Sequence, residues 1–221
     1  MSYNFKDLWY KHKAYGEDLK INFVPMQFGS KKLIFMKMGR SAGKSIMDNL
    51  LQVHKNNYSS KEKWSLGQGG NDKWLEENTD KKINKEYNVF INVRNPFSRV
   101  YSYFKSMNLY HYEWFPSDFN LFIREYFLDS KGNVKKIPGN GHLWSSSIHY
   151  EFENGQQFVD FVIKVENLTE DWKNFCSRVE IPYINLEKTK LIDYKPHFTS
   201  EQVEIVSTFY KRDLELFNYK F

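Results

Sequence analysis

The stretch 32–51 constrains the fold more than any other part of this 221-residue sequence. It begins with an apolar run, passes through a short loop bracketed by Gly39 and Gly43, and then changes to apolar residues at helical intervals. The residues at helical intervals are Ile46, Met47, Leu50 and Leu51. A strand, a loop and a helix in this order are typical of an α/β sheet protein.

The loop contains the groups that hold a phosphate-like anion. The first N–H groups of a helix have no helical partner, and the helix dipole places partial positive charge there. Arg40 and Lys44 add two positive charges, and Ser41 and Ser45 add hydroxyl donors. A basic turn without a ligand is the alternative, but glycines, hydroxyls and cations together favour an anion site.

The loop is not a standard ATP-binding loop. Only three residues separate Gly39 from Gly43, whereas the Walker A pattern has four residues before its Gly-Lys pair. An ATP-binding interpretation therefore begins with a defect in spacing.

Composition predicts a single α/β domain over 32–221, with residues 1–31 as an N-terminal extension packed on it. The chain is 41% hydrophobic and 18% aromatic, so it can bury a sizeable core, and no linker divides it. The net charge of +5 suits anionic ligands. The lysines, however, are scattered among Glu and Asp, whereas a nucleic-acid binder concentrates its charge on one element. We therefore expect no nucleic-acid partner.

Cysteine content and hydropathy indicate the compartment. The only cysteine, Cys176, excludes an internal disulfide, gives no indication of a zinc site and is expected to be a small core residue. The sequence has no apolar run long enough for a signal peptide or a membrane helix. We expect a soluble, cytoplasmic protein without a membrane partner, and the sequence indicates no oligomeric state.

A second stretch, 87–105, contains another candidate ligand site. It reads as a buried strand over 89–93 followed by a helix that begins with a proline. Arg94 follows the strand directly, at the carboxyl end where open α/β sheets bind ligands. Arg99 and Ser102 are three residues apart on the helix and share a face. An arginine at the strand end and a serine on the helix favour a second phosphate site.

Together the two stretches resemble sulfotransferases that use 3′-phosphoadenosine 5′-phosphosulfate (PAPS). The sequence RNPFSRVYS at 94–102 resembles their 3′-phosphate motif, R-[DN]-P-x-x-R-x-x-S, and the loop 39–45 resembles their 5′-phosphosulfate loop, commonly P-K-T-[AG]-[GS]-[TS]-S. FVIKVENL at 161–168 is similar to the family's F-x-x-x-x-E-N-L segment, and 209–219 is similar to its closing Y-x-x-D-x-x-L-F-x-Y. More specifically, 32–221 is similar to the carbohydrate-type group, which includes heparan and chondroitin sulfotransferases and bacterial relatives.

The resemblance implies both a fold and a reaction. The fold would be a three-layer α/β sandwich with a central parallel sheet, like that of P-loop nucleotide kinases. The reaction would move a sulfuryl group from PAPS to a hydroxyl of an acceptor, expected to be a saccharide, and leave adenosine 3′,5′-bisphosphate without using a metal. By analogy with phosphoryl transfer, positioning and charge stabilisation would dominate this in-line transfer.

The resemblance also assigns residues to the cofactor. Arg40, or Lys44 in its place, would act on the bridging oxygen between phosphate and sulfate, although the family usually has Lys and a hydroxyl residue at these two positions. Arg94 and Ser102 would bind the 3′-phosphate, with Arg99 in support. The loop residues that would contact the cofactor are Gly39, Arg40, Ser41, Ala42, Gly43, Lys44 and Ser45. By similarity, the segment 186–195 would fold over the cofactor.

A general base should accept the proton of the acceptor hydroxyl. Many relatives carry a histidine between the first helix and the second motif, but 55–87 contains none. The substitutes are Asp72, which also fits a helix cap, His54, which also fits a surface position, and His142. We rank His142 first, because it lies near a family segment that often carries a histidine on the acceptor side.

Two further segments are candidates for the acceptor side. The loop 67–72 corresponds in position to the region of the usual base. Five aromatic residues either stack on an acceptor ring or fill the core. They are Tyr110, Tyr112, Trp114, Phe115 and Trp144.

Two other functions compete with sulfuryl transfer. A nucleotide-dependent kinase could use Gly43, Lys44 and Ser45, but Arg94 stands at the strand end where a kinase needs an Asp for magnesium. A non-catalytic protein could keep the cofactor fold without a base, and the missing histidine in 55–87 supports this alternative.

Overall fold

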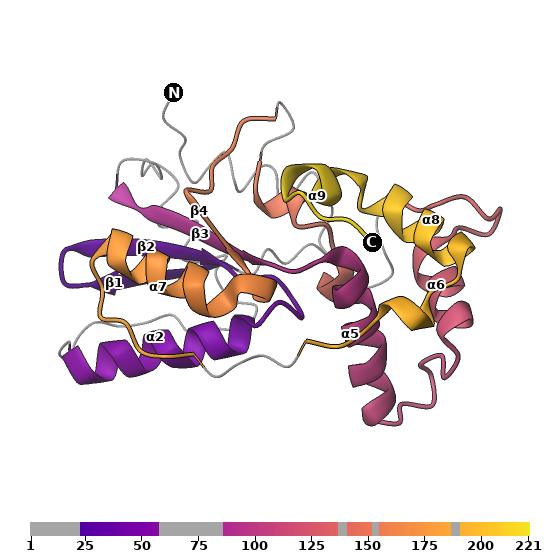
Figure 1. Cartoon of the computed structure of the whole chain (residues 1–221), viewed down its shortest axis with the longest axis horizontal. Coiled ribbons are helices and arrows are strands. Elements are labelled where there is room, and N and C mark those ends of the chain that lie inside the picture. The colour runs from indigo at the N-terminus through magenta and orange to yellow at the C-terminus, as the bar shows by residue number, and fades with distance from the viewer. Residues whose placement is uncertain (1–22, 58–85, 137–140, 152–154, 187–190) are drawn as a thin grey trace. The chain divides into compact units, whose positions relative to one another are not determined.

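The computed structural model of the chain describes residues 23–57, 86–136, 141–151, 155–186 and 191–221. These residues divide into two compact units, whose elements are labelled in Figure 1. The described residues of the first unit are 23–38, 42–57, 86–93, 149–151 and 155–186. Those of the second unit are 39–41, 94–136, 141–148 and 191–221. The predicted domain 32–221 thus spans both units.

The first unit is built on one open, mixed sheet of four strands in the order β1-β2-β3-β4. β1 (Phe23–Phe28) pairs antiparallel with β2 (Lys31–Met36), and β2 pairs parallel with β3 (Asn88–Val93). β3 in turn pairs parallel with β4 (Phe161–Lys164). The predicted α/β class and the strands that correspond to the apolar runs at 33–36 and 89–93 are confirmed. The sheet was predicted to be parallel, but it is mixed, because β1 pairs antiparallel with β2.

The strand β1 was not predicted, because its sequence FVPMQF does not look like a strand. Pro25 lacks a backbone N–H, and a proline in a sheet is tolerated at an edge. β1 stands at the edge of this sheet, so the part of 1–31 that the structure describes contributes a strand to the sheet.

Helices α2 (Gly43–Asn57) and α7 (Leu168–Val179) flank the sheet, and both pack into one apolar cluster with it. Phe35 of β2 stacks on Phe90 of β3 with ring centroids 4.6 Å apart. Leu50 of α2 and Trp172 of α7 are completely buried in the same cluster. The predicted amphipathic helix after the loop is therefore confirmed.

Cys176 is part of this cluster, as expected of a small core residue. Burial raises the pKa of its thiol to about 12, so the thiol stays protonated at neutral pH.

The second unit is helical and has an aromatic core. Its α-helices are α5 (Pro96–Leu109), α6 (Phe119–Phe127), α8 (Ser200–Phe209) and α9 (Lys211–Leu216). The short 3-10 helices of the chain are η1 (Gly141–Leu143), η2 (Ser147–His149), η3 (Val165–Asn167) and η4 (Lys195–His197). Helix α5 begins as predicted, with Pro96 in its first turn and the side chain of Asn95 accepting a bond from the N–H of Phe97.

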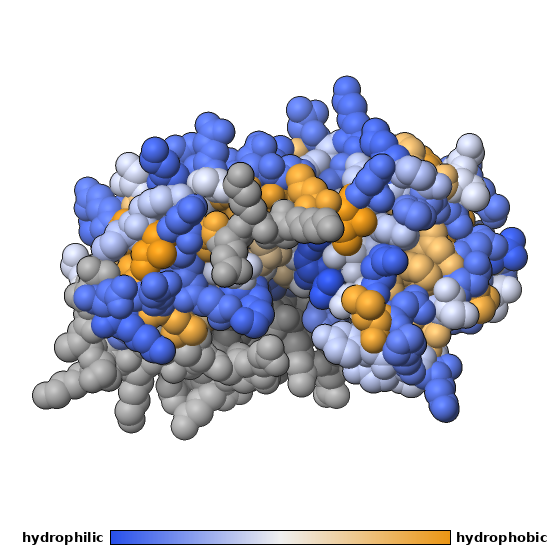
Figure 2. Space-filling model, turned by 60° about the horizontal axis from the view of Figure 1, so that its bottom comes forward, coloured by the Kyte–Doolittle hydropathy of each residue, from blue (hydrophilic) through white to orange (hydrophobic). Residues whose placement is uncertain are grey.

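The surface is mainly hydrophilic on the face drawn in Figure 2, where hydrophobic residues form small separate areas. None of the described helices combines the length and the apolar character that crossing a membrane requires.

Candidate functional site

The predicted phosphate loop is divided between the two units. Gly39, Arg40 and Ser41 belong to the second unit, whereas Ala42 and the residues after it belong to the first. Arg40 and Ala42 both have a φ of 59°. This left-handed conformation costs a residue with a side chain roughly 1–2 kcal/mol. The backbone of the loop is therefore strained at two residues.

In the first unit, the start of α2 is packed closely. The N–H of Ile46 donates to the carbonyl of Ala42 at 3.1 Å, which closes the first turn. A Cβ atom on Gly43 would lie 2.8 Å from the side chain of Lys37 and 3.4 Å from that of Asn92. Only glycine fits this position without moving its neighbours.

Lys44, like Arg40, is an exposed cation of the loop. Its side chain is 87% exposed, and its Nζ lies 2.5 Å from a carboxylate oxygen of Asp48, one turn along α2. Exposed pairs of this kind contribute little to stability. Lys44 could therefore leave Asp48 for a stronger anion at small cost.

Asn92 of β3 holds the chain just before the loop. Its Oδ1 accepts a bond of 2.7 Å from the N–H of Met38, and its Nδ2 donates to the carbonyl of Met38 at 3.3 Å. Sequence reasoning assigned Asn92 only to a strand. A polar residue in the middle of an apolar strand was the signal for this role.

In the second unit, Arg40 lies beside α5, the helix that contains most of the second motif. Its Nη2 donates to the carbonyl of Ser102 at 3.3 Å and lies 3.4 Å from the hydroxyl oxygen of the same residue. Desolvation lowers the pKa of the guanidinium, while Tyr110 and Tyr103 oppose the shift. Arginine nevertheless stays charged at neutral pH. A cation in a partly desolvated position is stabilised by a bound anion.

Arg94 is buried next to Arg40. Its Nε donates to the hydroxyl of Ser98 at 2.9 Å, and its Nη1 donates to the backbone carbonyl of Arg40 at 3.2 Å. The second motif therefore contacts the first through two arginines and the hydroxyls of α5. Spacing along the sequence predicted each motif, and the structure brings their residues Arg40, Arg94 and Ser102 together.

The candidate base His142 lies on the same side of the second unit. A Cβ atom on Gly39 would be 2.7 Å from its Nδ1, so the histidine packs directly against the residue that precedes Arg40. Its ring also lies 5.9 Å from the ring of Tyr103, measured between centroids.

The other two candidate bases do not belong to the described residues of the second unit. His54 is buried in the first unit, where its ring meets the edge of Phe28 at 6.1 Å. Asp72, with the whole loop 67–72, lies outside the described residues, as do residues 187–190 of the predicted cofactor cover.

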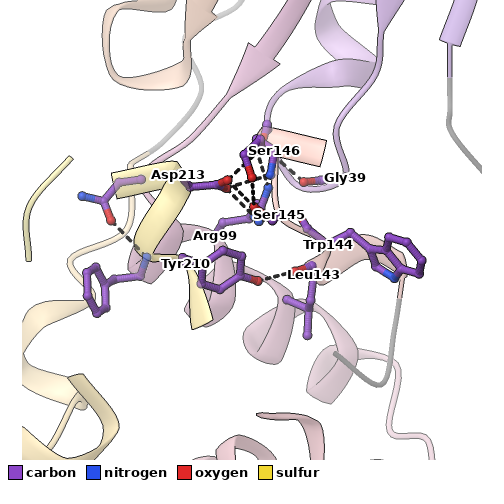
Figure 3. A network of polar contacts seen from close by, with 12 residues as sticks. Gly39, Arg99, Leu143, Trp144, Ser145, Ser146, Tyr210 and Asp213 are labelled. Carbon is purple, nitrogen blue, oxygen red and sulfur yellow. Dashed lines mark hydrogen bonds and ion pairs between the residues drawn. The ribbon is translucent and has the colours of Figure 1, made fainter. Parts of the chain in front are cut away.

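Arg99 has a different environment, shown in Figure 3. Its guanidinium is completely buried and donates to the carbonyl of Trp144 at 2.7 Å and to the hydroxyl of Ser146 at 2.9 Å. It also lies 3.8 Å from the carboxylate of Asp213 and 5.0 Å from the ring centre of Tyr210. Arg99 therefore binds protein groups on the segment that follows His142.

Asp213 completes this network from α9. Its carboxylate accepts bonds from the N–H groups of Ser146 at 2.7 Å and Ser147 at 2.8 Å, and from the hydroxyl of Ser145. Tyr210 donates its hydroxyl proton to the carbonyl of Leu143. Sequence reasoning had noticed these two residues only as part of the closing segment 209–219 and had not predicted their role.

The five candidate acceptor aromatics separate into two sets. Phe115 and Trp144 are buried, whereas Tyr110, Tyr112 and Trp114 are exposed on the second unit. The described residues contain no cluster of His, Cys, Asp and Glu side chains that could hold a metal ion.

Comparison with protein-family models, with curated proteins and with solved structures finds no match to this chain. A functional assignment therefore depends on the motifs and on the geometry of their residues.

Proposed function

We propose that the chain is a PAPS-dependent sulfotransferase that transfers a sulfuryl group to a hydroxyl of a saccharide acceptor. The observation that carries the proposal is the group formed by Arg40, Arg94, Ser98 and Ser102 in the second unit. The group includes two positively charged side chains, which favour the binding of an anion. Arginine is also the residue that binds phosphate oxygens in a fixed, bidentate geometry.

In this proposal each motif holds one end of the cofactor. Arg94 and Ser102 bind the 3′-phosphate, while Arg99 supports them through the segment that follows His142. The loop 39–45 binds the 5′-phosphosulfate through its backbone N–H groups and the hydroxyls of Ser41 and Ser45. The sheet and helices would then form a three-layer sandwich of the nucleotide-kinase type, in a cytoplasmic protein.

The packing of His142 against Gly39, the residue before Arg40, supports a reaction in which both side chains take part. The acceptor oxygen attacks the sulfur atom, and the bond from sulfur to the bridging oxygen breaks. His142 takes the proton of the acceptor hydroxyl, and adenosine 3′,5′-bisphosphate leaves with the bridging oxygen. Arg40, with Lys44, neutralises the charge that develops on this oxygen. Replacing Arg40 with Ala should therefore lower kcat more than cofactor affinity.

The decisive experiment is a thermal-shift titration without magnesium. Adenosine 3′,5′-bisphosphate at a hundredfold excess over its Kd should stabilise the protein by about 2.7 kcal/mol. Adenosine 5′-monophosphate should do much less, because it has no 3′-phosphate for Arg94 and Ser102. Arg94→Ala should remove the difference between the two nucleotides, whereas Arg124→Ala, which alters an exposed arginine of α6, should keep it.

The same titration separates the competing functions. A larger shift with magnesium-ATP than with the bisphosphate would indicate a kinase, although Asn92, Val93 and Arg94 supply no carboxylate for magnesium at the end of β3. Binding of the bisphosphate without any turnover of PAPS would indicate a non-catalytic protein.

A further inference from the structure

Three exposed aromatic side chains follow α5 in a row, and we call them the aromatic strip. They are Tyr110, Tyr112 and Trp114, with exposed fractions of 67%, 44% and 63%. Neighbouring rings are 5.8 Å apart between the two tyrosines and 5.3 Å apart between Tyr112 and Trp114, whose planes differ by 26°. Large exposed aromatic rings that gather in one place mark a binding surface.

The strip is held in place from below. Phe115 is buried, and its ring packs edge-on with that of Trp114, with the ring centroids 5.9 Å apart. Its N–H donates to the carbonyl of Tyr112. The amide of Asn108 donates to the carbonyls of Phe104 and Pro116 on either side of the strip. Rings that are already ordered lose little entropy when a ligand binds.

The backbone at the strip is strained as well. His111 has a φ of 50°, and it stands just past the end of α5, where glycine is the usual residue. Strain of this kind persists where the surrounding structure enforces it, which is frequent at functional sites. Here it turns the chain between Tyr110 and Tyr112.

Within the second unit, neighbouring aromatic side chains connect the aromatic strip with the candidate catalytic residue His142. The ring centroid of Phe115, which lies 5.9 Å from that of Trp114, also lies 5.9 Å from that of Tyr103 on α5. The ring centroid of Tyr103 in turn lies 5.9 Å from that of His142. Contacts between neighbouring rings therefore link the aromatic strip to His142, the candidate base.

The charge of this region restricts the ligand. Residues 106–123 contain Glu113 and Asp118 but no Lys or Arg. Within the strip itself, Glu113 places a negative charge between Tyr112 and Trp114, which disfavours a polyanionic acceptor at this place. Glu113 is exposed and can instead accept hydrogen bonds from hydroxyl groups.

We propose that the aromatic strip is the acceptor subsite and that it binds an uncharged oligosaccharide. The apolar faces of sugar rings would pack on Tyr110, Tyr112 and Trp114, and Glu113 would accept bonds from ring hydroxyls. A row of rings on an open surface suits several sugar units in line better than a single small alcohol. This assignment of the acceptor rests on the proposed function, but binding to the strip is measurable without the cofactor.

The test is calorimetric titration of the full-length protein with the trisaccharide of N-acetylglucosamine. Trp114→Ala and Tyr112→Ala should each weaken binding about tenfold, as expected of aromatic residues that dominate a contact. In turnover assays the same variants should raise KM for the trisaccharide and leave kcat unchanged. Tyr183→Ala is the matched control, because Tyr183 is 41% exposed on the first unit, and it should bind normally.

Each other outcome overturns the inference. Tighter binding of a glucuronate-containing tetrasaccharide would show a polyanionic acceptor, and tighter binding of 4-nitrophenol would show an aromatic alcohol. Absence of trisaccharide binding, or normal binding by Trp114→Ala, would show that the strip is not the subsite. If the trisaccharide binds as expected but adenosine 3′,5′-bisphosphate gives no thermal shift, the strip is a saccharide-binding site without being an acceptor subsite, and the proposed sulfotransferase activity fails.

Discussion

The two units of the chain are stabilised in different ways. The first unit places an apolar cluster between its sheet and the helices α2 and α7, with Leu50 and Trp172 completely buried. The second unit also has an apolar core, but it buries the charged pair of Arg99 and Asp213 next to that core. Apolar packing depends on size and shape, whereas a buried ion pair depends on the identity of both partners.

This difference predicts how each unit tolerates substitution. Hydrophobic side chains of similar volume can replace one another in a core at small cost. No other residue can replace Asp213 in the same way, because its carboxylate accepts bonds from three consecutive serines as well as facing Arg99. The second unit should therefore be the more sensitive of the two to a single conservative change.

The largest effect should come from Asp213→Ala. It leaves the guanidinium of Arg99 buried without its counterion, which costs about 3–5 kcal/mol. Chemical denaturation followed by circular dichroism measures the loss. Glu215→Ala is the control on the same helix, since Glu215 is exposed in its pair with Arg212, and it should change stability little. A loss as small as that of Glu215→Ala would mean that the pair does not stabilise the unit.

A double variant sharpens this result. Arg99→Met combined with Asp213→Leu removes both charges and should recover much of the stability lost in Asp213→Ala. If the stability losses of the two single substitutions add up in the double variant, the loss in Asp213→Ala comes from packing and not from the unpaired charge.

A smaller effect is expected for Leu50→Ala in the first unit. The truncated side chain leaves a cavity in the apolar cluster and should lower the free energy of unfolding by about 2–5 kcal/mol. Leu50→Met should cost less than about 1.5 kcal/mol, since it nearly conserves volume. Leu191→Ala, at a leucine that is 50% exposed, should have almost no effect. If Leu50→Met lowered stability as much as Leu50→Ala, the stability of the first unit would depend on side-chain identity as strongly as that of the second.

The smallest effect concerns Asp171, a partly buried carboxylate of the first unit. Asp171 accepts a bond of 2.8 Å from the N–H of Lys164, and burial raises its pKa despite this bond. A raised pKa means that the folded protein binds the proton more tightly than the unfolded chain. Its contribution to stability is present at low pH and is lost as the pH rises through the folded pKa.

Asp171→Asn should therefore become more stable relative to the natural protein as the pH rises from about 3 to 7. Thermal unfolding across this range measures the difference. Glu170→Gln, at an exposed residue of the same helix turn, is the control and should show a flatter dependence. A difference that falls with rising pH would have the wrong sign and would contradict the raised pKa.

Sequence reasoning predicted the parts of the molecule that follow local rules. The change from an apolar run to helical spacing located β2 and α2, and Leu50 is buried as its position in the pattern requires. The two motifs were each located at the end of a strand. Here periodicity and motif spacing contain the necessary information. The contact of Arg40 with Ser102, however, was not predicted.

The remaining features depend on contacts between distant residues. Asp213 meets Arg99 across more than a hundred positions of sequence, and no local pattern marks such a pair. Pro25 concealed an edge strand, because its strand is recognisable only from the pairing with β2. The strain at Ala42 is likewise set by the surrounding structure, since the residue itself does not favour a positive φ.

The order of the strands has a consequence for translation. β3 pairs with β4, but residues 94–160 lie between them in the chain. A ribosome adding about 5–20 residues per second needs roughly 3–13 s to make that segment. During this interval one edge of β3 stays without its partner and can pair with other nascent chains. Recovery of folded protein should thus improve when β4 emerges sooner, and faster elongation through 94–160 should favour correct assembly over aggregation.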